Sequence, residues 1–151
     1  GQLSVNHALR KIDTPSILFF LGILLSIAAL QATGVLNNLA TAMNDSIGNI
    51  KIITLSIGLL SAIVDNVPLV AAAQGMYGLD QYPTGHFFWE FLAYCAGTGG
   101  SCLIIGSAAG VAAMGLEKIE FFWYMKKIGW LALIGYLSGA AVFLLQHYLT
   151  G

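Results

Sequence analysis

Three long stretches of the chain contain no Asp, Glu, Lys or Arg, and this feature limits its possible folds more than any other. They cover residues 14–44, 91–116 and 128–146. Each meets the roughly 20 residues that a helix needs to cross a hydrocarbon core about 30 Å thick. Only 9% of all residues are charged, whereas an ordinary soluble domain carries about 25%. The sequence therefore predicts an all-α integral membrane protein.

Several function classes find no support in the sequence. The net charge is −1 and no basic run is present, so we expect no nucleic-acid partner. Cys95 and Cys102 lie seven residues apart in an apolar segment, which favours two reduced thiols over a metal or redox motif. No Cys/His, Ser/His or metal-ligand spacing occurs. We expect neither an enzyme nor a bound cofactor, but a membrane protein that binds or moves a small solute.

The apolar segments divide the chain, residues 1–151, into one membrane unit with four parts. Polar and glycine-rich residues interrupt them. The predicted elements are a transmembrane helix at 15–36, a polar connector at 37–49, a re-entrant hairpin at 50–78, a broken transmembrane helix at 86–115 and a transmembrane helix at 121–149. The aromatic residues suited to the membrane interfaces are Trp123, Tyr124, Trp130 and Tyr148.

The second segment is interrupted by the polar sequence Asp65-Asn66-Val67-Pro68. The apolar arms on either side have roughly 9 to 13 residues, about 14 to 20 Å as helix, so neither arm crosses a bilayer alone. One interrupted crossing and a re-entrant hairpin both fit this pattern.

The basic residues favour the hairpin, because short loops rich in Lys and Arg stay in the cytoplasm. Two basic clusters flank the segments: Arg10 and Lys11 before the first, and Lys118, Lys126 and Lys127 between the third and the fourth. Both clusters fall on one side only if the second segment returns to the side from which it entered. We therefore expect a hairpin that opens toward the outer face, where Lys51 lies.

The third segment carries Gly97-Thr98-Gly99-Gly100-Ser101 in its middle. Each glycine costs roughly 1 kcal/mol relative to alanine inside a helix, which predicts a break at 97–101. Non-helical backbone at membrane depth occurs where it is buried in protein or lines a wet cavity, and in transporters it holds ions or substrates. We expect the hairpin tip at 65–68 and this break to approach each other and form a site.

Asp65 is the most informative single residue, because it is the only acid between Asp45 and Asp80 and is predicted to lie near mid-membrane. Burying a charge there costs about 2.5 to 3.5 kcal/mol, and such residues usually mark ion or proton pathways. A carboxylate in this position can hold either Na⁺ or H⁺. The alternative is that Asp65 or Asn66 caps the second arm, with Pro68 in its first turn; both roles can hold together.

The side chains and free carbonyls at the tip and the break are hard oxygen ligands, which suit an alkali cation. The candidate cation- and proton-binding residues are Ser61, Asp65, Asn66, Thr98, Gly99, Gly100 and Ser101, with Na⁺ or Li⁺ held at Asp65, Asn66 and Ser101. Ser61 faces the same side of its arm as Asp65. A hydroxyl bonded back to its own helix explains Ser61 equally well.

Small residues elsewhere predict packing rather than binding. Gly106 and Gly110, and likewise Gly135 and Gly139, are four residues apart, as in faces for close helix contact. Ser107 is a weaker site candidate than Thr98 or Ser101, because it lies outside the predicted break.

Two long motifs resemble a known family. They are Ser61-Ala-Ile-Val-Asp65-Asn66-Val-Pro68-Leu-Val-Ala-Ala and Gly97-Thr-Gly-Gly-Ser-Cys-Leu-Ile-Ile-Gly-Ser-Ala-Ala-Gly-Val-Ala-Ala-Met-Gly115. They closely resemble the NhaD-type sodium/proton antiporters, part of the ion transporter superfamily, which also contains dicarboxylate and arsenite carriers. The resemblance covers nearly the whole chain, from Leu18 onward.

The resemblance implies a fold of two inverted repeats, each with a re-entrant hairpin and a broken helix, whose site-bearing part moves like an elevator. This chain resembles the second repeat only, the C-terminal half of such a transporter. The expected partners are therefore the lipid bilayer, the missing N-terminal half and a second copy in a homodimer. We expect a bacterial inner membrane, with a plastid envelope as the alternative.

Three functions stay open. The first is half of a transporter that exchanges Na⁺ or Li⁺ for H⁺, with cation and proton competing for Asp65. The second is a carrier of an anion or oxyacid, such as a dicarboxylate or arsenite, for which an uncharged hairpin tip is expected. The third is a non-transporting membrane subunit. The acid at the tip favours the first.

Overall fold

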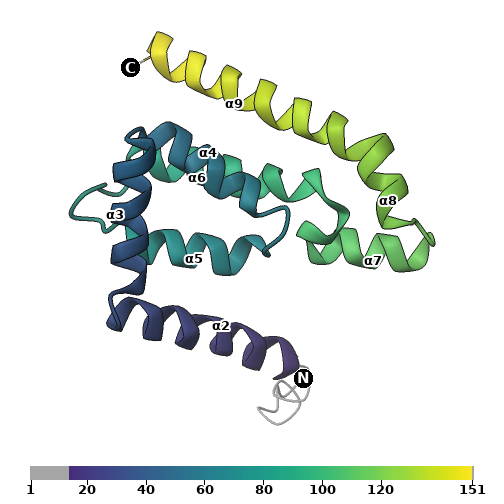
Figure 1. The fold of residues 1–151 in the computed structure, drawn as a ribbon, viewed down its shortest axis with the longest axis horizontal. Coiled ribbons are helices and arrows are strands. Elements are labelled where there is room, and N and C mark those ends of the chain that lie inside the picture. Colours follow the sequence, from purple (N-terminus) through teal and green to yellow (C-terminus); the bar gives the residue numbers. More distant parts are fainter. Residues whose placement is uncertain (1–13, 151) are drawn as a thin grey trace, which may run out of the picture.

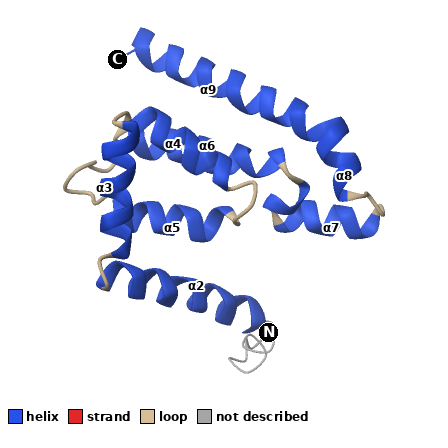
Figure 2. Cartoon of the chain, in the orientation of Figure 1, coloured by secondary structure: helices blue, strands red, loops and turns tan. Residues whose placement is uncertain are grey.

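The structure, a computed structural model, describes residues 14–150 (Figure 1). Arg10 and Lys11, on which the predicted orientation partly depends, lie outside the described residues. The described residues form only helices, turns and loops (Figure 2), so the all-α prediction is confirmed for this range.

Eleven helical elements follow one another along residues 14–150. Their bounds are α2 (Thr14–Ala32), α3 (Val35–Ile47), α4 (Ile50–Leu60), α5 (Asn66–Met76), α6 (Phe87–Gly99), the short η1 (Gly100–Cys102) and η2 (Ile104–Gly106), α7 (Ala108–Leu116), α8 (Phe121–Tyr124), η3 (Met125–Gly129) and α9 (Trp130–Thr150).

The first apolar segment ends at Ala32, earlier than the sequence predicts, and a second helix follows it at once. Residues 21–32 and α3 meet at an angle of 71°. Gly34 makes this bend with φ 75°, a left-handed conformation that favours glycine. Most of the predicted connector at 37–49 is therefore helical. Its inward face carries Leu36 and Ala40, while its asparagines are exposed.

Helices α4 and α5 form an antiparallel hairpin joined by a turn at residues 61–65. Figure 1 shows the open end of this hairpin beside α3 and its turn pointing toward α7. Helix α4 packs mainly against α6, and α5 packs against α2 and α3. The structure thus contains the two short arms and the tight turn that the polar interruption predicts.

The third segment is broken, but later than predicted. Gly97, Thr98 and Gly99 are still helical. The break runs from Gly100 to Ser107: two short 3₁₀ turns are separated by the extended residue Leu103, and the extended residue Ser107 precedes α7. The prediction of a break at 97–101 is therefore wrong in its position, and correct only at its last two residues.

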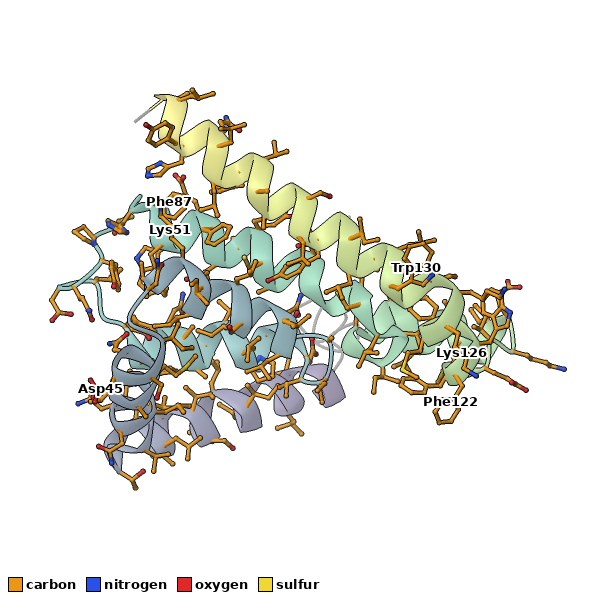
Figure 3. All side chains as sticks on the ribbon, turned by 45° about the horizontal axis from the view of Figure 1, so that its top comes forward. Asp45, Lys51, Phe87, Phe122, Lys126 and Trp130 are labelled. Atoms are coloured by element: carbon orange, nitrogen blue, oxygen red, sulfur yellow. The ribbon has the colours of Figure 1, made fainter. Side chains whose placement is uncertain are left out.

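The chain then returns along one long helix. Helix α8, η3 and α9 are continuous over Phe121–Thr150, 30 residues that are long and apolar enough to cross a membrane. Among residues 14–150, the bent pair of residues 21–32 and α3 satisfies the same test only if it counts as one span. Figure 3 shows Lys51 and Lys126 toward opposite ends of the molecule, and their location on opposite sides of a membrane stays a prediction.

Two buried clusters hold the helices together. One joins α3, α4, α5 and α6 around Ile53, Tyr77 and Phe88, and the other joins α6 to α9 around Phe91 and Tyr136. Many large apolar side chains are nevertheless exposed, for example along α9 at Leu131, Ile134, Leu137, Val142 and Leu145. Such a surface fits contact with lipid or another protein segment.

Candidate functional site

The end of α4 and the end of α6 touch through glycines. A Cβ on Gly99 would overlap the carbonyl oxygen of Gly58, and a Cβ on Gly58 would lie 2.5 Å from the Cβ of Cys95. Both positions therefore require glycine. This contact also explains why the helix does not break at Gly99, since the glycine there allows two backbones to pack closely.

Ser61 links the hairpin turn to α6. Its side chain is fully buried, and its hydroxyl lies 2.6 Å from the carbonyl oxygen of Gly58 and 3.1 Å from that of Ala96. The hydroxyl therefore bonds back to its own helix, as the alternative explanation predicts, and also reaches the neighbouring helix. In this structure Ser61 fixes one element of the site against another.

The non-helical backbone of the break packs on the same turn. A Cβ on Gly106 would lie 2.7 Å from the carbonyl oxygen of Ser61 and 2.8 Å from the Cα of Ala62. A Cβ on Gly100 would lie 2.9 Å from the carbonyl oxygen of Gly106. The hairpin turn and the break therefore meet, and these contacts run through Ser61 and Ala62. Residues 65–68 begin at the last residue of this turn.

Asp65 occupies the N-cap position of α5, but its side chain makes no capping hydrogen bond. It is half-buried, as is Asn66, the first residue of α5. Pro68 lies in the first turn of the helix, as the sequence predicts. Within residues 14–150, the structure gives the Asp65 carboxylate no hydrogen bond or ion pair. The N-cap position was predicted correctly, but capping does not occupy the carboxylate.

Thr98 and Ser101 differ in how their oxygens are used. The exposed Thr98 hydroxyl donates to the carbonyl oxygen of Tyr94 at 2.7 Å, within its own helix. Ser101 is exposed, and its main-chain carbonyl accepts a hydrogen bond of 2.9 Å from the Tyr124 hydroxyl. Ser107 caps α7 through the Gly110 N–H at 3.0 Å, a role that explains this residue without a bound ion.

Sequence reasoning missed the part played by two tyrosines. The Tyr136 hydroxyl of α9 lies 2.6 Å from the carbonyl oxygen of Leu55 in α4. The Tyr94 hydroxyl of α6 lies 2.9 Å from the carbonyl oxygen of Tyr136. These bonds hold α9 on α4 and α6, behind the site. No local pattern signals them, because the bonded residues are 81 and 42 positions apart.

The arrangement suits binding rather than covalent chemistry. Within the part of the chain that the structure describes, no three His, Cys, Asp or Glu side chains group as a transition-metal site. Cys95 and Cys102 are buried free thiols in the contact between α6 and α9. What the hairpin and break offer is a carboxylate, an amide, a hydroxyl and main-chain carbonyls, all oxygen donors that suit a hard cation.

Comparison with known proteins gives one family and several relatives. A family model described as citrate transporter matches residues 1–92. The chain is 53% identical over 148 residues to "Sodium/proton antiporter 1" of Arabidopsis thaliana, covering 98% of this chain and 26% of that protein. It is 35% identical over 138 residues to "Na(+)/H(+) antiporter NhaD" of Alkalimonas amylolytica, covering 89% of this chain and 27% of that protein.

A second bacterial relative agrees with the first. The chain is 36% identical over 128 residues to "Na(+)/H(+) antiporter NhaD" of Vibrio parahaemolyticus, covering 81% of this chain and 29% of that protein. The chain therefore spans between a quarter and a third of the length of these relatives. No solved structure matches it.

Proposed function

We propose that this chain, which belongs to the citrate-transporter family of membrane transporters, forms part of a secondary transporter that exchanges Na⁺ or Li⁺ for H⁺. Family membership makes it a piece of a transporter rather than of an enzyme. Its similarity to antiporters of the NhaD type and to the plant sodium/proton antiporters extends over most of its length. The exchange itself is a proposal for the whole protein, of which this chain is a part.

The observation that carries this proposal is the Asp65 carboxylate, half-buried at the hairpin turn and without a partner among the described residues. A negative charge at membrane depth is costly unless it is neutralised. Either a proton or an alkali cation neutralises it, and each excludes the other. Competition between the two for one carboxylate is sufficient to couple their movements in opposite directions.

The surrounding backbone supports a cation at this place. Helix α6 ends at the hairpin contact, and the C-terminal end of a helix carries a partial negative charge from its unpaired carbonyls. We assign the cation to oxygens of Asp65, Asn66 and Ser101, with carbonyls of Gly99 and Gly100 as further donors. The Ser61 and Thr98 hydroxyls donate their protons to carbonyl oxygens, which fixes their orientation and leaves their oxygen lone pairs as further donors.

We assign the chain to the second of two inverted repeats. In this assignment the α4–α5 hairpin is re-entrant, α6 and α7 are the two halves of a broken transmembrane helix, and the first repeat lies in the rest of the protein. Short helices that meet near their ends, with non-helical backbone between them, are typical of transporter sites at the bilayer midplane. Both plant and bacterial relatives are known, so a plastid envelope and a bacterial inner membrane both fit.

A cavity supports access to this site from the open end of the hairpin. It has a volume of about 550 Å³ and lies between α5, α6 and the loop that joins them. Val70 and Gln74 line it from α5. Asn66, Val70 and Gln74 are spaced four residues apart, so they lie on one face of the helix. The wall of the cavity therefore shares one face of α5 with Asn66 at the hairpin turn.

A carboxylate carrier is the second candidate, favoured by the family model's description as a citrate transporter. An anionic substrate at the hairpin turn would meet the negative charge of Asp65, and like charges at close range repel each other. The carrier function would therefore require Asp65 to be protonated or paired with a co-transported cation. The antiporter needs no such additional partner.

The deciding experiment uses the full-length protein in inverted membrane vesicles from antiporter-deficient cells. The assay measures the collapse of a pH gradient on addition of Na⁺ or Li⁺, with Asp65 native or changed to Asn. Asp80→Asn is the control, because Asp80 is an exposed acid in the loop after α5. We expect collapse with the native protein and the control, and none with D65N.

Two other results would overturn the proposal. If Na⁺ and Li⁺ have no effect on well-expressed native protein while citrate or another carboxylate drives transport, the protein is an anion carrier. If neither cations nor anions are moved, the subunit function replaces it. Equal cation-driven collapse with native protein and D65N would retain antiport but remove Asp65 from the site.

A further inference from the structure

The contact between Tyr124 and Ser101 joins the long return helix to the break. The Tyr124 hydroxyl at the end of α8 donates to the Ser101 carbonyl oxygen at 2.9 Å. Residues that follow a helix end have carbonyls with no intrahelical donor. The donor that the structure gives to the Ser101 carbonyl comes from an element 23 residues further along the chain.

A second contact holds the same two elements in register. A Cβ on Gly129 would lie 2.8 Å from the carbonyl oxygen of Cys102. Two consecutive carbonyls of the break, those of Ser101 and Cys102, are therefore met by the segment from Tyr124 to Gly129. That segment is a π turn, Met125–Gly129, in an otherwise α-helical run.

The π turn explains how one segment reaches both carbonyls. Its hydrogen bonds join residues five apart, and such turns are rare and frequent at functional sites. Tyr124 and Gly129 are five residues apart, so the wider turn brings both toward the break. In a regular α-helix, at 3.6 residues per turn, two residues five apart point about 140° away from each other around the axis.

From these contacts we propose that Tyr124 is a positioning residue for Ser101, and that Ser101 offers its side-chain hydroxyl, rather than its carbonyl, to the transported cation. Tyr124 takes up the main-chain carbonyl and fixes the peptide. The Ser101 side chain is exposed and stays available as a ligand. This inference rests on the proposed cation exchange and specifies which atom of Ser101 takes part.

The first test compares Tyr124→Phe with Ser101→Ala in the full-length transporter. Loss of one oxygen ligand of the cation, or of the hydrogen bond that positions it, should raise the half-saturating Na⁺ concentration about fivefold while the maximal rate is kept. The double variant should be no worse than Ser101→Ala alone, because Tyr124 acts only by positioning the hydroxyl that Ser101→Ala removes. Tyr148→Phe is the control, since Tyr148 is 83% exposed near the end of the same long helix.

A second measurement does not depend on transport. With Cys95 and Cys102 replaced by Ala, a cysteine introduced by S101C is labelled with a water-soluble maleimide, with and without Y124F. We expect the labelling rate to change when the Tyr124 hydroxyl is removed. If native protein shows no cation exchange but the labelling rate still changes, the proposed function fails and the positioning contact stands. Unchanged labelling together with an unchanged Na⁺ dependence for Y124F would overturn the inference.

Discussion

The hydroxyl of Ser61 in the hairpin turn lies 3.1 Å from the carbonyl oxygen of Ala96 in α6. This single side chain ties the hairpin to the helix that precedes the break. Because the contact is fully buried, water cannot replace it when it is lost. This serine oxygen therefore adds a directional bond to the close glycine contacts that join the two halves of the site.

Replacing Ser61 by Ala should destabilise the protein by about 1 kcal/mol, the net contribution of a buried hydrogen bond. Ser56→Ala is the matched control in the same helix, because the Ser56 hydroxyl bonds only to the Ile52 carbonyl of its own helix. Thermal unfolding of the purified full-length protein in detergent measures both. A melting temperature lowered equally by the two variants would show that the link to α6 contributes nothing.

The glycines of the Gly97–Ser101 motif should respond oppositely to alanine. Gly99→Ala should prevent normal packing, since its Cβ would overlap the Gly58 carbonyl oxygen. Gly97 has no atom within 4 Å of its Cβ position among the described residues and lies inside α6. Gly97→Ala should therefore stabilise the helix by up to about 1 kcal/mol. Expression level and thermal unfolding check the pair, and equal behaviour would contradict the packing argument.

The same two glycines show where sequence reasoning succeeds and where it stops. The charge-free stretches correctly predicted an all-helical chain over residues 14–150. The Asp65–Pro68 interruption lies where α5 begins, but the turn before it covers residues 61–65, so the predicted tip at 65–68 is already mostly helical. Glycine content predicted a break two or three residues too early. Helix propensity assigns every glycine in a helix the same loss of stability, whereas Gly99 is kept helical by its contact with Gly58. Propensity is local, and this contact joins residues that are distant in sequence.

The predicted site was likewise recovered only in part. Ser61, Gly99 and Gly100 lie together where the hairpin meets the break. Whether Asp65, Asn66 and Ser101 share one cation stays a prediction. The tyrosine contacts were not foreseen, because an aromatic residue in an apolar segment carries no mark of the carbonyl that it will reach. Tyr124 was placed at a membrane interface by its residue type alone.

Alanine substitution should change the melting temperature differently at Gly135 and at Gly139, as we expect for Gly97 and Gly99. A Cβ on Gly139 would overlap the Tyr94 hydroxyl, whereas Gly135 has open space at its Cβ among the described residues. Gly139→Ala should lower the melting temperature, and Gly135→Ala should not. Tyr94→Phe should partly rescue Gly139→Ala, because it removes the overlapping oxygen. Full additivity of the two changes in a double-mutant cycle would contradict direct contact.

Comparing the N-cap residues Ser107 and Asp65 tests whether the Asp65 carboxylate has a functional or a structural role. Ser107 makes a capping bond to the Gly110 N–H at 3.0 Å, so Ser107→Ala should lose about 1 kcal/mol of stability. Asp65 makes no such bond at the start of α5. Its replacement by Asn also removes a half-buried charge, so D65N should be as stable as the native protein or more stable.

In a transport assay, the effects of D65N and Ser107→Ala should be the reverse of their effects on stability. We expect D65N to abolish Na⁺-driven collapse of the pH gradient, and Ser107→Ala to retain it in the fraction of protein that folds. Unfolding in detergent and vesicle transport, measured on the same two variants, give the comparison. If D65N instead lowered the melting temperature as far as Ser107→Ala and transported normally, Asp65 would be a helix cap, and the carboxylate would have no part in exchange.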